Sequence, residues 1–232
     1  MFMSGCTEHA YVQYLYPAKE ANVISNLPGS GNVLWHGNPT LPEIALTFDD
    51  GPNSKNTPKV LDILKAYNVK ATFFVLGKFI EKNKDILKRE AKEGHSIGNH
   101  TYTHADGKIT DTAKIERELG KTSDLILKYS GIRPKLFRPP FGFENWRFFN
   151  EAERLNNDIV LWTTDIGDWD HKKTESAILS GISRNTRNGS IILLHDGGSS
   201  REAVLNALPK IITSLKKKGY RFVTIDEMIS HL

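Results

Sequence analysis

Two adjacent carboxylates, Asp49 and Asp50, stand at the end of a short apolar segment and directly before a Gly-Pro turn. The carboxyl ends of strands are where α/β proteins usually place their catalytic groups, so this pair is a candidate site. Successive strand residues point to opposite faces, so one carboxylate could hold a metal ion while the other accepts a proton. The alternative is a solvated turn, because Asp and Gly are common turn residues.

Two histidines four residues apart, His100 and His104, follow the predicted strand 96–99. Residues at this spacing share one face of a helical turn, so we expect a turn that presents both imidazoles to one metal ion. Together with a carboxylate from a neighbouring strand end they would give three protein ligands and leave positions open for water or substrate. The alternative is a pair of surface histidines.

Three further strand ends carry groups suited to catalysis. Arg138 enters a stiff double-proline segment and could orient a carboxylate such as Asp49. Asp165 follows the next apolar run, and His195 closes the one after it. A surface arginine and a core histidine are the ordinary structural explanations when each residue is taken alone. Packing does not readily explain five strand ends that bring Asp, His, Arg, Asp and His to one rim.

Short apolar runs alternate with amphipathic segments from residue 43 onward. The expected strands are Glu43–Phe48, Ala71–Leu76, Ser96–Asn99, Lys135–Arg138, Ile159–Thr163, Ser190–His195 and Arg221–Thr224. The expected helices are 57–67, 79–93, 110–130, 145–155, 174–187, 201–218 and 225–231. About seven βα units predict an α/β fold with parallel strands, because parallel strands need crossover helices, and they can close into a (β/α)7-type barrel.

Composition limits the classes of function. The 232 residues, 39% hydrophobic and 25% charged, suit one α/β domain. The net charge of +4 is small, and the densest basic run, 216–218, lies at a predicted helix end before Gly219, so we expect no nucleic-acid binding. We find no apolar stretch long enough for a transmembrane segment, and we expect a monomer.

The N-terminal segment differs from the rest of the chain. Residues 1–42 lack clear periodicity, and we expect a leader that packs on the domain of residues 43–232. The one cysteine, Cys6, excludes an internal disulfide. Residues 2–6 resemble the end of a bacterial lipoprotein signal, which makes Cys6 a candidate lipid anchor, although the apolar region of such a signal is missing and a chance match is the alternative.

Five motifs, in order along the chain, resemble those of the polysaccharide deacetylase family, the NodB homology domain of carbohydrate esterase family four. They are TFDDGP, HTYTH, RPPFG, DIGDW and LHD, and the resemblance covers roughly residues 43–231. It implies a distorted (β/α)-barrel and the metal-dependent removal of acetyl groups from a polysaccharide. Many members carry Tyr where this chain has Phe141, so a side-chain contact to sugar could be lost.

The resemblance also implies roles for single residues. The expected metal and catalytic groups are Asp50, His100 and His104 as metal ligands, Asp49 as general base, Arg138 to orient Asp49, His195 as general acid and Asp165 as the partner of His195. The expected substrate contacts are the backbone N–H of Phe141 to the oxyanion, with Trp169 and Leu194 lining the acetyl pocket.

The expected function is a metal-dependent hydrolase that removes N-acetyl groups from an N-acetylglucosamine-containing polysaccharide, either peptidoglycan or chitin and its oligosaccharides. The expected metal is Zn²⁺, with Co²⁺ or Ni²⁺ also suited to the ligands. We expect an extracellular or envelope-associated protein. The alternatives are an acetylxylan esterase of the same family, a non-catalytic glycan-binding module, and an iron oxygenase with a two-His-one-carboxylate site.

Overall fold

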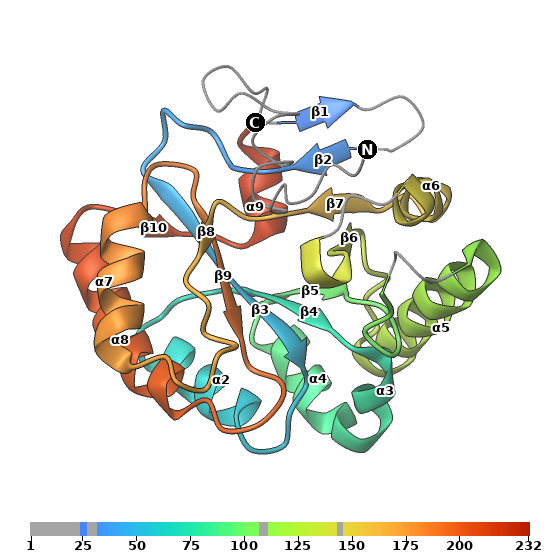
Figure 1. The fold of residues 1–232 in the computed structure, drawn as a ribbon, viewed down its shortest axis with the longest axis horizontal. Helices are drawn as coiled ribbons and strands as arrows, with labels where there is room; N and C mark the ends of the chain where they lie inside the picture. Colours follow the sequence, from blue (N-terminus) through green and yellow to red (C-terminus); the bar gives the residue numbers. More distant parts are fainter. Residues whose placement is uncertain (1–23, 27–31, 107–110, 143–145) are drawn as a thin grey trace, which may run out of the picture.

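The computed structural model describes residues 24–26, 32–106, 111–142 and 146–232. Its centre is a curled, barrel-like sheet surrounded by helices (Figure 1). The strands are β1 (Ile24–Asn26), β2 (Asn32–Leu34), β3 (Glu43–Gly51), β4 (Thr72–Val75), β5 (Ser96–Asn99), β6 (Leu136–Phe137), β7 (Asp158–Val160), β8 (Thr164–Asp165), β9 (Ile191–His195) and β10 (Arg221–Phe222). The α-helices are α2 (Thr57–Ala66), α3 (Gly77–Ile80), α4 (Lys84–Lys92), α5 (Thr112–Ser130), α6 (Trp146–Arg154), α7 (Glu175–Asn185), α8 (Glu202–Lys217) and α9 (Ile225–Ser230), and the 3-10 turns are η1 (Glu81–Asn83) and η2 (Pro140–Gly142).

The sheet closes through the link between β7 and β8. The strands lie in the order β1-β2-β7-β6-β5-β4-β3-β9-β8, and β10 pairs with the start of β3. Leu161 donates its N–H to the carbonyl of Leu34 on β2, whereas Thr163 donates to Ile191 at the start of β9. The chain therefore changes its bonding partner from β2 to β9 between residues 161 and 163. For this reason two short strands, β7 and β8, replace the single strand predicted over 159–163.

The predicted α/β barrel-like fold with parallel strands is confirmed. Apart from β1 with β2, the strand pairs of the described residues are parallel. The helix predicted over 79–93 is interrupted, because Asn83 has a non-helical backbone and its side-chain amide donates to the carbonyls of Pro52 and Phe79. No helix of the described ranges is long and apolar enough to cross a bilayer.

Part of the expected leader is a strand of the sheet. β2 pairs in parallel with β7, and its residues Val33 and Leu34 are buried. Cys6, the candidate lipid anchor, lies outside the described residues.

The two faces of β3 and β9 have different surroundings. Phe48 and Leu194 belong to the main hydrophobic cluster, which includes residues of α2 and α8. The alternate positions, among them Thr47 and Asp49, point to the opposite face, toward the interior of the curled sheet. This alternation separates the packing core from the face that carries polar groups.

A buried carboxyl on α4 has no hydrogen-bond partner within the described structure. Both oxygens of Glu90 are buried and unpaired, and burial, with a smaller contribution from Asp196, raises the pKa of Glu90 well above its usual value. The folded state therefore holds a proton that the unfolded chain releases above about pH 4.3. The contribution of Glu90 to stability is most favourable below that pH and is lost as pH rises toward its raised folded pKa.

We predict that Glu90→Leu raises the free energy of unfolding by about 1–3 kcal/mol near pH 8, because an unpaired buried carboxyl is replaced by an apolar group of similar size. The gain should be smaller at pH 5, and urea unfolding at both pH values measures it. Asp85→Asn, which changes an exposed carboxylate of the same helix, is the control. A loss of stability at both pH values would contradict the prediction.

Candidate active site

A fully buried arginine organises the polar interior. Arg138 donates through Nη1 to Asp49 Oδ1 and to Thr47 Oγ1, at 2.8 Å each. Its Nε donates to the carbonyl of Val160 at 3.1 Å, and Nη2 to that of Leu161 at 3.2 Å. Burial lowers the pKa of Arg138, but the Asp49 charge opposes this shift. The structure thus brings Arg138 and Asp49 together as predicted.

The three expected metal ligands converge. Asp50 Oδ1 lies 3.8 Å from His100 Nε2 and 3.6 Å from His104 Nε2. Tetrahedral coordination with bonds of about 2.1 Å separates neighbouring ligand atoms by about 3.4 Å, close to these distances. Asp50 Oδ1 is buried and has no hydrogen-bond partner among the described residues, as expected of an atom that is a metal ligand. These residues therefore fit a divalent cation.

The ligand histidines can each direct a ring nitrogen at the cluster. His100 Nδ1 donates to the carbonyl of Arg138 at 2.7 Å, which leaves the lone pair on Nε2 directed at the cluster. Burial, together with neighbouring His100, lowers the pKa of His104 to about 4. Both histidines are thus suited to metal binding near neutral pH.

The segment that carries these histidines is not helical, so the predicted helical turn is wrong. After β5 the chain forms a loop in which Thr101 and His104 adopt left-handed backbone angles, with φ of 69° and 68°. Asn99 Oδ1 accepts from the N–H of Thr101, and Thr101 Oγ1 accepts from the N–H groups of His104 and Ala105. Side-chain acceptors therefore compensate for the missing helical hydrogen bonds.

His195 is paired with Asp168, so the predicted pairing with Asp165 is wrong. Asp168 accepts from His195 Nδ1 at 2.7 Å and from the His195 backbone N–H at 2.8 Å. Burial alone would lower the pKa of His195, but the hydrogen bond and charge of Asp168, with smaller contributions from Asp49 and Asp50, raise it to about 8. His195 is therefore mostly protonated at neutral pH.

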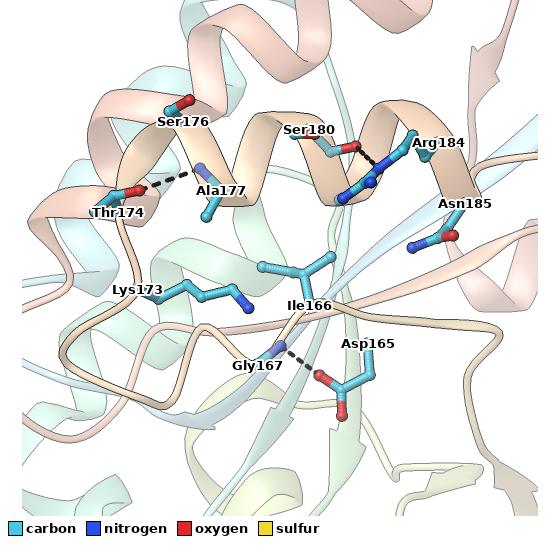
Figure 2. Close-up of a pocket in the computed structure, with 11 residues that line it drawn as sticks. Asp165, Ile166, Gly167, Lys173, Thr174, Ser176, Ala177, Ser180, Arg184 and Asn185 are labelled. Carbon is cyan, nitrogen blue, oxygen red and sulfur yellow. Dashed lines mark hydrogen bonds between the residues drawn. The ribbon is translucent and has the colours of Figure 1, made fainter.

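Asp165 lies elsewhere, on the exposed edge strand β8. Its Oδ1 accepts from the N–H of Gly167 at 2.7 Å. Asp165 borders a cavity of about 680 Å³, which Lys173 and Arg184 also line. Figure 2 shows these residues on the segment from β8 to α7. The cavity lining contains none of the Asp-His-His cluster. Asp165 is exposed because its two-residue strand pairs on one side only, with β9.

Two exposed aromatic side chains belong to motifs of the site. Phe141 is 56% exposed, and its ring makes an edge contact with His104 at 4.5 Å between centroids. Trp169 is 59% exposed and follows Asp168 directly. Leu194, by contrast, is buried in the main core, on the strand face opposite to His195. The predicted role of Leu194 in the acetyl pocket is therefore wrong, and Leu193 shares the face of His195.

Some supporting residues were not predicted. Asp168, the second carboxylate of DIGDW, lies in a motif that the sequence shows, but its pairing with His195 was not predicted. For the pocket, the two-residue period of a strand indicates Leu193, on the same face as His195, instead of Leu194. Arg201, which donates to the carbonyls of Gly197 and Asp168, gave no local signal. Glu118 on α5 gave none either, although it bonds the HTYTH loop.

The comparisons with known proteins agree with this geometry. The family model described as polysaccharide deacetylase matches residues 36–160. A peptidoglycan-N-acetylglucosamine deacetylase of Bacillus cereus is 40% identical over 207 residues, which cover 88% of this chain and 96% of that protein. A crystal structure of a peptidoglycan N-acetylglucosamine deacetylase in complex with an N-hydroxybenzamide compound has a TM-score of 0.82 and 40% identity, over 84% of this chain and 92% of that one. A family 4 acetyl xylan esterase from Clostridium thermocellum in complex with a cobalt ion has a TM-score of 0.76 and 37% identity, over 81% and 90% of the two chains.

The two aspartates of DIGDW should differ in their effect on His195. We predict that Asp168→Asn lowers the pKa of His195 from about 8, because burial is then opposed only by the smaller contributions of Asp49 and Asp50. Asp165→Asn should leave the pKa unchanged. An NMR titration of the His195 ring protons in both variants measures this, and a shift in Asp165→Asn alone would contradict the assignment.

Proposed function

Because the chain belongs to the polysaccharide deacetylase family, we propose that it hydrolyses the N-acetyl groups of N-acetylglucosamine units in peptidoglycan. The observation that carries this proposal is the convergence of Asp50, His100 and His104 beside Asp49, together with a protonated His195 on the adjacent strand. The deacetylases of this family depend on a divalent metal. An amide needs such help, since water is a poor nucleophile and an amine is a poor leaving group.

We assign the metal to the Asp-His-His cluster and propose Zn²⁺, with Co²⁺ or Ni²⁺ as substitutes, since imidazole and carboxylate ligands suit all of them. A divalent cation held there by Asp50, His100 and His104 would lower the pKa of bound water and polarise the acetyl carbonyl. The acetyl xylan esterase with a similar structure was crystallised with cobalt, which supports the cluster as a cation site.

We assign the general base to Asp49. Its Oδ1 accepts the Arg138 hydrogen bond, whereas its Oδ2 faces the ligand cluster, 3.7 Å from His100 Nε2. Oδ2 is thus positioned to take a proton from water as the new C–O bond forms. Arg138 also bonds β7 and the link that follows it, and this support keeps the carboxylate in one orientation.

We assign the general acid to His195. His195 Nδ1 donates its hydrogen bond to Asp168, so Nε2 is the atom that would give its proton to the amine nitrogen as the C–N bond breaks. A pKa of about 8 keeps that proton available at neutral pH and predicts that activity falls as pH rises above it.

Three further residues would stabilise and bind the acetyl group. We propose that the backbone N–H of Phe141 donates to the oxyanion, a kind of contact whose loss typically costs about 3 kcal/mol. This role uses the main chain, so Phe in place of Tyr leaves it intact. Trp169 and Leu193 are the proposed pocket residues for the methyl group.

The polymer is assigned from the relatives. The Bacillus cereus protein and the similar crystal structure both carry the name of a peptidoglycan deacetylase, which supports peptidoglycan over chitin. Such a substrate would place the activity at the cell envelope or outside the cell, with Cys6 as the candidate anchor. We propose a monomer, since each group of the proposed site comes from one chain.

Three alternatives are weaker. The similarity to an acetyl xylan esterase supports ester hydrolysis as a second activity of the same residues. A glycan-binding module without catalysis would not need a base, an acid and three ligands together. An iron oxygenase could use the two histidines and Asp50, but would not need the His195–Asp168 pair.

Acetate release from a panel of substrates tests the reaction class. We predict metal-dependent release from peptidoglycan glycan and chitopentaose, with less from acetylated xylan. Chelation should abolish release and added zinc should restore it, because the proposed reaction needs a cation bound at the Asp-His-His cluster. Saccharide binding without release from any substrate, with metal bound, would favour the binding module.

Asp49→Asn tests the base. We predict that kcat falls by about 10²- to 10⁴-fold, the usual contribution of a general base, while the metal stays bound by Asp50 and the histidines. Asn retains an acceptor for Arg138 but leaves its buried charge without a carboxylate partner, so the melting temperature is measured as well. Asp165→Asn, at an exposed carboxylate, is the control and should keep normal activity. Undiminished turnover in Asp49→Asn, measured with its metal content, would exclude the assignment.

A further inference from the structure

A carboxylate of α5 bonds the loop between the two ligand histidines. Glu118 Oε2 accepts from the backbone N–H of Tyr102 at 2.8 Å and of Thr103 at 2.6 Å, and Oε1 accepts from Thr103 Oγ1 at 2.9 Å. The three donors lie between His100 and His104 in the sequence, so one side chain supports the whole connection between two ligands.

Glu118 is also buried, and in the described part of the chain no cation pairs with it. An unpaired buried charge is costly, so its hydrogen bonds must have good geometry for the folded state to retain it. An apolar residue at this position of α5 would pack in the core without that cost. The carboxylate is therefore explained by the loop that it bonds.

The loop needs support because its backbone is strained. Thr101 and His104 have left-handed backbone angles, which are unfavourable for a β-branched residue such as Thr101. Backbone support comes from Asn99 and Thr101 within the segment and from the N–H groups of Gly77 and Lys78, which donate to the carbonyls of Thr101 and Tyr102. Two lysines also contact the loop: Lys78 Nζ donates to the carbonyl of Thr103, and Lys121 Nζ lies 3.7 Å from the centre of the Tyr102 ring. Among the residues that the structure describes, only Glu118 accepts from the amides of residues 102 and 103.

We infer that Glu118 is a positioning residue that sets the affinity and geometry of the metal site by fixing the loop of His100 and His104. This inference rests on the proposed function, because it takes the Asp-His-His cluster as the metal site. Residues that orient metal ligands without touching the metal typically change its affinity by about 10- to 100-fold when they are replaced.

Metal titration of four proteins tests the inference. We predict that Glu118→Ala weakens binding of Zn²⁺ and Co²⁺ by about 10- to 100-fold in calorimetric titration and alters the visible absorption of bound Co²⁺. Glu118→Gln should stay close to the wild type, because the Gln oxygen can accept from both amides while its NH₂ donates to Thr103 Oγ1. Glu116→Ala, at an exposed position of the same helix, is the control.

The outcomes separate positioning from general support. A purely structural role would lower the melting temperature of the metal-free protein and leave the Co²⁺ spectrum and affinity unchanged, and that result would overturn the inference. If Glu118→Ala fails to fold, Glu118→Asp, whose acceptor is one methylene shorter, replaces it, and unchanged affinity there would also overturn it. A wild-type protein that binds no metal would instead count against the proposed function.

Discussion

The buried ion pair of Arg138 and Asp49 is the interaction on which the site depends. A guanidinium inside a sheet is tolerable only when its donors are satisfied, and here the acceptors come from β3, β7 and the link after β7. Its guanidinium carbon also lies 4.1 Å from the centre of the Phe74 ring. Removing one partner of such a pair usually costs about 3–5 kcal/mol, so the charge that orients the base also holds together the strands around it.

The same interior gives two histidines opposite properties. His104 is buried beside another imidazole, and its pKa falls to about 4. His195 is also buried, yet the carboxylate of Asp168 raises its pKa to about 8. Neutral imidazoles suit metal binding and a charged one suits proton donation, so the position of one carboxylate separates the two roles. Both histidines are buried, so it is the neighbouring polar groups that set their pKa values and suit one to metal binding and the other to proton donation.

Hydrophobic periodicity and the order of the motifs were sufficient to predict the regular part of the molecule. The parallel strands, most helices and the convergence of His100 and His104 with a carboxylate from a neighbouring strand were predicted, since strand ends of a parallel sheet meet at one edge, and the family resemblance identified that carboxylate as Asp50. Errors arose where the backbone departs from regular geometry. The HTYTH loop is not helical, and Asp165 lies on a short edge strand while Asp168, after the left-handed Gly167, reaches His195. Side-chain direction in such loops depends on distant partners that a local pattern does not contain.

The residues that support the site are far from the motifs in sequence. Glu118 reaches the HTYTH loop from α5, and Arg201 reaches the carbonyl of Asp168 across 33 positions. The backbone of the motifs is strained, since Asp50 at the end of β3, Thr101 and Phe141 all have left-handed backbone angles, and strain of this kind persists only where surrounding structure fixes it. The motifs thus supply the reactive groups, whereas residues outside them, such as Glu118 on α5, supply hydrogen bonds that hold the HTYTH loop in its conformation. A chain that kept the motifs but lost the helix contacts would retain the chemistry of the side chains and lose their arrangement.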